Sequence, residues 1–123
     1  MTFHFKETSM KINVLNALRQ AWSAQSSSKW RIGNPAKGQC GVTSLVVQDI
    51  LGGEIRKTRL DEGWHFYNVI NGERMDFTEE QFSSKIDYQD IDSNRAEAYL
   101  DTNRAQYSYL KSQVNRHLER AEG

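Results

Sequence analysis

The amino-acid sequence predicts an α+β fold, in which a small antiparallel sheet packs against a cysteine-bearing helix between N- and C-terminal helices. Apolar residues recur at helical spacing near both ends of the chain. An aromatic and β-branched run at residues 64–70 is followed by Asn71-Gly72, a strong signal for a two-residue hairpin turn. Because 123 residues suit one hydrophobic core, we expect residues 1–123 to form a single domain.

The first expected helix covers residues 8–24. Its apolar stripe is formed by Ile12, Leu15, Leu18 and Trp22. The next segment, residues 25–39, carries the turn signals Gly33-Asn34-Pro35 and Lys37-Gly38. We expect a structured loop here, because Trp30 and Ile32 give it apolar side chains to bury.

A second helix is expected over residues 40–51, and Gly52 is a natural residue to end it. One face carries Val42, Leu45, Val46 and Ile50. Its start lacks a preceding serine, threonine, aspartate or asparagine cap, and its first turn contains no acidic residue. We therefore expect its first N–H groups to face something other than a capping side chain.

Three strands are expected next, at residues 54–60, 64–70 and 73–77. Residues 78–81 (TEEQ) have the pattern of a capping box that opens a short helix. From about residue 92 the chain is again expected to be helical, with a break near residues 101–103. The charged side chains of this last part are interpreted as a solvated helix face.

The hairpin places a histidine beside a carboxylate. If Ile70 pairs with Glu73, the same register puts Tyr67 opposite Asp76, and His65 and Asp76 become diagonal neighbours on one face. Diagonal positions lie roughly 7–8 Å apart, so an imidazole and a carboxylate can meet. Such a carboxylate fixes the histidine tautomer and stabilises the charged imidazolium.

Cys40 is the only cysteine and stands at an expected helix N-terminus, where the helix dipole favours the thiolate. We predict a thiol pKa below about 8.5. Thiol, imidazole and carboxylate supply a nucleophile, its base and the group that orients the base. The Cys40 backbone N–H is a candidate oxyanion donor, and Gln39 or Asn34 could supply the second.

Each candidate also has a plain structural interpretation. Cys40 can be a small buried residue, His65 a hydrogen-bonded structural histidine, and Asp76 the end of a strand. Trp30 and Trp64 either wall a cleft or pack in the core. No two histidines have metal-ligand spacing, so neither a metal nor another cofactor is expected.

The composition of the chain indicates which kinds of partner and which cellular compartment to expect. Lysine plus arginine number 16, as do aspartate plus glutamate, so net charge does not point to nucleic acid or a membrane surface. No run approaches the about 18 apolar residues of a membrane span, and the N-terminus has no apolar secretory segment. A single cysteine fits a reducing compartment, so a cytoplasmic location is expected. The oligomeric state stays open.

Three stretches resemble the YunG family of small bacterial proteins: residues 34–43 (NPAKGQCGVT), 63–68 (GWHFYN) and 74–78 (RMDFT). The likeness spans about residues 30–82 and, more loosely, the C-terminal helices. The order of Cys helix, His strand and Asp strand also resembles the papain-like cysteine hydrolases, including the NlpC/P60 and transglutaminase-like groups. That resemblance implies a papain-like core in which Cys40 is the nucleophile, His65 the base and Asp76 the orienting residue.

Two functions of different classes follow. The first is a thiol-dependent hydrolase or acyl transferase that acts on an amide, isopeptide or thioester bond of a peptide-like or small amide substrate, without a cofactor. The alternative is a non-enzymatic binding module that holds a protein partner in its groove or on its C-terminal helix. A redox-sensing thiol is the third option, disfavoured because the chain has no resolving cysteine.

Overall fold

The computed structural model describes the backbone of residues 2–122 and the side chains of residues 9–121. Within this part, helices α1 (Thr2–Ala21), α2 (Cys40–Leu51), α3 (Arg95–Tyr99) and α4 (Arg104–Glu122) accompany strands β1 (Glu54–Leu60), β2 (Gly63–Ile70), β3 (Glu73–Met75) and β4 (Ile91–Asp92). The strands form one antiparallel sheet in the order β3-β2-β1-β4, and a short 3₁₀ helix, η1 (Glu79–Gln81), follows β3. The expected α+β class is confirmed.

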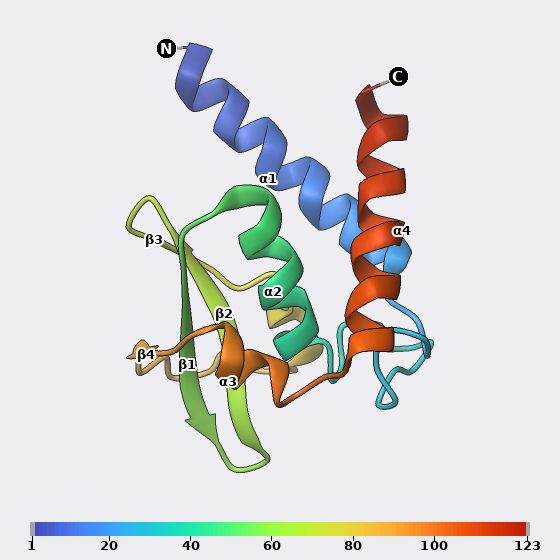
Figure 1. Ribbon diagram of the computed structural model, residues 1–123. Helices are drawn as coiled ribbons and strands as arrows, with labels where there is room; N and C mark the ends of the chain where they lie inside the picture. Colours follow the sequence, from blue (N-terminus) through green and yellow to red (C-terminus); the bar gives the residue numbers. More distant parts are fainter. Residues whose placement is uncertain (1, 123) are drawn as a thin grey trace.

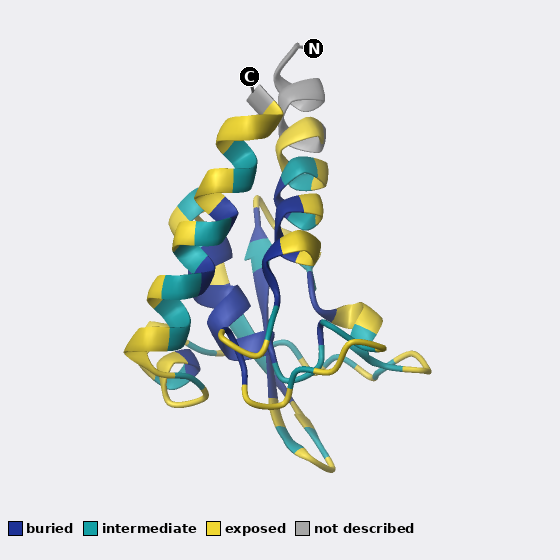
Figure 2. Cartoon of the chain, turned by 90° about the vertical axis from the view of Figure 1, so that its right-hand side faces the viewer, coloured by how far each residue is buried: buried dark blue, intermediate teal, exposed yellow. Residues whose placement is uncertain are grey.

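Helix α2 is the central element of the fold (Figure 1). One side of it contacts β1 and β2, and another contacts α3 and α4, while α1 packs along α4. The main core cluster joins α1, α2 and α4 through Val14, Leu18, Val42, Val46, Leu110 and Val114. Figure 2 shows that the buried residues line the inner sides of the helices and the sheet beneath them. This packing fixes the position of Cys40, the first residue of α2.

The predicted hairpin register is confirmed. Val69 pairs with Arg74 and Ile70 pairs with Glu73. Asn71 and Gly72 have φ values of 53° and 77°, as a two-residue turn of type I′ requires. The return strand ends at Met75 rather than at residue 77, so the expected pair of Tyr67 and Asp76 lies just beyond the ladder.

The side chain of Asp76 explains this early end. Its Oδ1 accepts the backbone N–H of Thr78 at 3.1 Å, which turns the chain away from β2. Thr78 Oγ1 also donates to Asp76 Oδ1, at 3.2 Å, and makes no cap hydrogen bond to η1. The predicted capping box was therefore wrong, because the threonine hydroxyl serves the aspartate instead.

The sheet is buried on both faces near the start of β2. Phe66 and Asn68 face α2, and the alternation of a strand places His65 and Tyr67 on the opposite side. The segment between η1 and β4 covers that side: the Phe82 ring meets His65 edge-on at 4.9 Å between centroids, and Tyr88 meets Tyr67 at 5.0 Å. Because β3 ends at Met75, the first half of β2 pairs with β1 only.

The bounds of α2 and β1 are those expected, whereas α1 extends further toward the N-terminus than its apolar stripe. A helix can propagate past its packed residues, because each added residue gains a backbone hydrogen bond. Strand β4 was not predicted, since two residues carry no recognisable pattern. The expectation that Ile32 is buried was wrong: its side chain is 87% exposed at the tip of the loop.

Candidate functional site

Cys40 and a distant aspartate meet at the start of α2. Cys40 Sγ donates to Asp101 Oδ2 at 3.6 Å, and the Gly41 backbone N–H donates to the same oxygen at 3.3 Å. The residue before the helix, Gln39, makes no cap hydrogen bond. The start of α2 is thus capped by a side chain from the connection between α3 and α4. The expectation that its N–H groups face something other than a capping side chain was wrong, because the cap comes from 60 residues along the chain.

The pKa of the Cys40 thiol is raised to about 12, which overturns the prediction of a value below about 8.5. Burial is the main cause, since the side chain is only 8% exposed, and the negative charge of Asp101 adds to it. A backbone hydrogen bond from Phe66 acts in the opposite direction. Desolvation therefore outweighs the helix dipole, and Cys40 is a protonated thiol at neutral pH.

His65 and Asp76 form a buried pair. His65 Nε2 lies 2.6 Å from Asp76 Oδ2, and the two side chains are 3% and 2% exposed. The Tyr88 hydroxyl donates to the same Oδ2 at 2.7 Å, while Thr78 supplies two donors to Oδ1. Because a carboxylate only accepts, Nε2 is the nitrogen that carries the proton in this bond. Nδ1 takes part in no hydrogen bond among the described residues.

One cavity of about 140 Å³ brings Cys40 and His65 together. Cys40, His65 and Asp101 line it together. Its remaining walls are formed by Lys29, Lys37, Gly38, Leu60, Glu62, Gly63, Trp64, Gln81 and Phe82. No hydrogen bond joins Cys40 to His65 within the described part of the chain, where the thiol donates to Asp101. The cavity is thus lined by a thiol, an imidazole and the Asp101 carboxylate, whereas Asp76, the partner of His65, does not line it.

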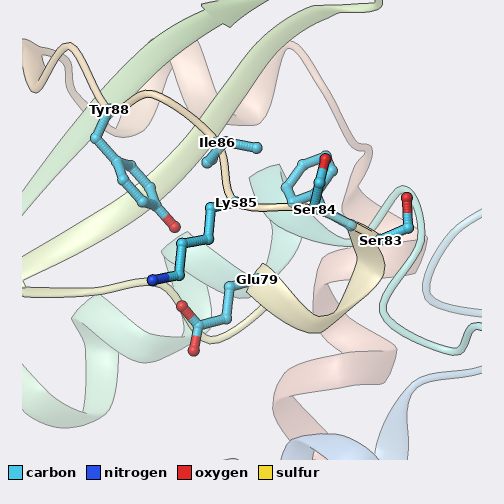
Figure 3. A pocket seen from close by; sticks show the side chains of 7 residues that line it. Glu79, Ser83, Ser84, Lys85, Ile86 and Tyr88 are labelled. Carbon is cyan, nitrogen blue, oxygen red and sulfur yellow. The ribbon is translucent and has the colours of Figure 1, made fainter.

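A larger hollow of about 610 Å³ adjoins this cavity (Figure 3). Phe82 lines both spaces, and the other lining residues are Glu79, Ser83, Ser84, Lys85, Ile86 and Tyr88. The ring of Tyr88 faces the hollow in Figure 3, while its hydroxyl reaches Asp76. The hollow and the buried pair thus share a side chain.

Of the four further candidates from the sequence, only Trp64 lines the cavity. It is 40% exposed, with the Lys57 ammonium 4.2 Å from its ring centroid. Asn34 Nδ2 donates to the Gln81 carbonyl at 3.0 Å, and the fully buried Gln39 donates from Nε2 to the Ser23 carbonyl at 3.4 Å. Trp30 packs against the main core cluster.

Three residues of the site were missed: Asp101, Tyr88 and Gln81. The start of α2 has no capping residue directly before it, but this pattern does not identify Asp101 as the residue that caps it. Tyr88 and Gln81 reach the site through tertiary contacts, which a local sequence pattern does not predict. Within residues 9–121, no three histidine, cysteine, aspartate or glutamate side chains are grouped to hold a metal ion. None of the described helices is long and apolar enough to cross a membrane.

The fold and the site define a small α+β protein whose cysteine opens a central helix beside a histidine–aspartate pair. The chain belongs to the YunG family: the family model described as YunG protein matches residues 11–119. It is 58% identical over 101 residues to "Uncharacterized protein YunG" of Bacillus subtilis (strain 168), an alignment that covers 82% of this chain and 88% of that protein. No solved structure matches the chain.

Proposed function

We propose that this protein is a thiol-dependent hydrolase or acyl transferase that acts on an amide, isopeptide or thioester bond. Cys40 is the nucleophile, His65 the base and Asp76 the orienting residue. The observation that supports this most is the 2.6 Å bond between His65 and Asp76, since His65 lines the same cavity as Cys40, the first residue of α2. A papain-like core, with a peptide-like or small amide substrate, belongs to the same proposal.

The chemistry runs through a thioester intermediate. Cys40 Sγ attacks the carbonyl carbon and its proton passes to His65 Nδ1, while Asp76 holds the Nε2–H. His65 then gives that proton to the leaving amine or thiol as the carbonyl–leaving-group bond breaks. Water or an acceptor nucleophile attacks the thioester, His65 takes its proton, and the acyl–sulfur bond breaks. Return of the proton to sulfur restores the thiol.

The resting arrangement sets a condition on this mechanism. The thiol is protonated and donates to Asp101, so Sγ must exchange Asp101 for His65 Nδ1 before it attacks. General-base catalysis by His65 removes the proton during attack and does not require a preformed thiolate. Cys40 is therefore expected to react slowly with simple thiol reagents as long as no substrate carbonyl is in the cavity.

The same resting arrangement favours the alternative function, a binding module that keeps the fold without turnover. A buried protonated thiol bonded to a carboxylate can be purely structural. Trp64 then becomes the central residue, because it is a partly exposed aromatic side chain at the cavity. In that case partner affinity survives Cys40→Ser and falls in Trp64→Ala.

A panel of fluorogenic amide and thioester substrates tests the proposal. Turnover is measured for the wild type, Cys40→Ala, His65→Ala, the double variant, and Asp76→Asn. Residues that act as one unit are not additive, so each single alanine variant should abolish most turnover and the double variant should lose little more. Asp76→Asn should be milder, because an amide can still hold the ring.

The matched control is His117→Ala, which removes a histidine of α4 that does not line the cavity. It should leave turnover unchanged. Product formation undiminished in Cys40→Ala would overturn the nucleophile assignment.

A further inference from the structure

Gln81 carries a polar group that the fold leaves unused. Its Nε2 is buried and has no hydrogen-bond partner among the described residues. Gln81 lines the cavity that contains Cys40 and His65. Buried donors are nearly always hydrogen-bonded. An unpaired donor on a residue that lines the same cavity as a candidate nucleophile is therefore unusual, and it is available to bind a ligand.

The rest of the Gln81 residue is held in place. Its Oε1 accepts the Gly38 backbone N–H at 3.4 Å, and its carbonyl oxygen accepts Asn34 Nδ2 at 3.0 Å. Because the Gly38 N–H can only donate, it fixes the amide with Oε1 toward Gly38 and Nε2 turned away. The donor is therefore oriented before any substrate arrives, because its amide is anchored to Gly38, two residues before Cys40.

A second unused donor lies at the nucleophile itself. The Cys40 backbone N–H stands at the first position of α2, where a helix offers no internal partner. Among the described residues it makes no hydrogen bond, whereas the next N–H, from Gly41, is taken by Asp101. A backbone N–H and a side-chain amide beside one thiol are the two donors that acyl transfer uses to bind a developing oxyanion.

We infer that Gln81 is a further catalytic residue, whose Nε2 forms an oxyanion hole with the Cys40 backbone N–H. This inference rests on the proposed acyl transfer at Cys40. When Sγ bonds to the carbonyl carbon, the π electron pair moves to the carbonyl oxygen, which accepts hydrogen bonds from both donors. The pair returns as the bond to the leaving group breaks, and neither donor gives up its proton.

The experiment compares two electrophiles on Cys40. An activated ester, p-nitrophenyl acetate, acylates sulfur through a tetrahedral oxyanion, whereas iodoacetamide alkylates it by displacement at a saturated carbon, without one. Rates of both reactions are followed by mass spectrometry of the Cys40 adduct. The variants are Gln81→Met, which keeps the volume without a donor, and Gln81→Glu, which keeps an acceptor for Gly38 and loses the Nε2 donor.

Acylation should fall by about 10²–10³ in both Gln81 variants relative to their own alkylation rates, as for other oxyanion donors. The control is Gln89→Met, since Gln89 is an exposed glutamine bonded to the backbone of Arg59, and it should change neither rate. Normalising to alkylation removes any effect of the new charge in Gln81→Glu on the thiol pKa.

Other outcomes overturn the inference in distinguishable ways. If the Gln81 variants are acylated like the wild type, Gln81 is not an oxyanion donor, although Cys40-dependent acylation still supports the proposed function. If acylation and alkylation fall together, Gln81 has only a structural role. If wild-type Cys40 is acylated no faster than a cysteine in a short peptide, the proposed function fails and the inference with it.

Discussion

Asp101 Oδ2 accepts the backbone N–H of Gly41 at 3.3 Å, across a sequence separation of 60 residues. The same oxygen accepts from Cys40 Sγ. A carboxylate at a helix N-terminus is favourable, because it meets the positive end of the helix dipole. Its charge also disfavours a thiolate next to it, so the contact that stabilises α2 also helps to keep the Cys40 thiol protonated.

Asp101→Asn should make Cys40 more reactive. The amide can still accept the Gly41 N–H, but the negative charge that raises the thiol pKa is gone. Well below the pKa, each unit by which it falls raises the thiolate fraction about tenfold. Iodoacetamide alkylation at pH 7.5 should accelerate, while stability falls by only about 0.3–1 kcal/mol.

Asp87→Asn is the control for this substitution, because Asp87 is an exposed aspartate outside the cavity. Its alkylation profile should match that of the wild type. An unchanged profile in Asp101→Asn would contradict the role given to the Asp101 charge.

The raised thiol pKa predicts a pH dependence of stability. A group whose pKa is higher in the folded state contributes stability below its unfolded pKa, about 8.5, and loses it as the pH rises toward the folded value of about 12. The unfolding free energy of the wild type, minus that of Cys40→Ser, should stay constant to about pH 8.5. Above that pH it should fall by up to about 1.4 kcal/mol per pH unit.

Urea titrations of both proteins from pH 6 to 10.5 measure this difference. Other titrating groups are common to the two proteins and cancel. A flat difference across the whole range would mean that the folded and unfolded thiols share one pKa.

Gly41→Ala should destabilise the protein although alanine is the better helix former by about 1 kcal/mol. A Cβ on Gly41 would lie 2.7 Å from the Asp101 side chain and 2.9 Å from the Ala98 carbonyl oxygen, closer than real contacts allow. We expect a net loss of about 1–3 kcal/mol, measured by chemical denaturation. Gly33→Ala is the matched control, because its Cβ would meet nothing within 4 Å, and it should change stability by less than about 0.5 kcal/mol.

Tyr88→Phe should weaken the His65–Asp76 pair. The substitution removes the donor at 2.7 Å from Asp76 Oδ2 and leaves the ring in place. Loss of a hydrogen bond to a buried acceptor costs about 1–3 kcal/mol, which thermal denaturation would detect. Tyr99→Phe, at a 39% exposed tyrosine, should be close to neutral. Equal stabilities of the two variants would show that the Tyr88 hydroxyl does not support Asp76.

The features that the sequence predicts well are those set by neighbouring residues. Residues 40–51 and 54–60 carry their periodicity locally, and Asn71-Gly72 fixes the hairpin register that brings His65 to Asp76. The early end of β3 was not predicted. The alternation of strand residues does not show that the Asp76 side chain will accept the Thr78 backbone N–H and turn the chain.

The environment of Cys40 could not be predicted in the same way. Its position at a helix start indicated a lowered thiol pKa, and burial against Phe66 and Ala98 reverses the sign. Burial depends on how the second half of the chain folds over the first. Asp101 shows the same limit, since a residue between two helices has no local pattern that marks it as a cap.

The separation between Cys40 and Asp101 has a consequence for biosynthesis. A ribosome releases α2 and the β1–β2 hairpin long before Asp101 leaves the exit tunnel, since the thiol and its carboxylate partner are separated by 61 positions in the sequence. During that interval the thiol has no carboxylate beside it and remains open to oxidants and electrophiles. The thiol thus gains its carboxylate partner only when the chain is nearly complete, and a translation product that stops before Asp101 lacks that partner.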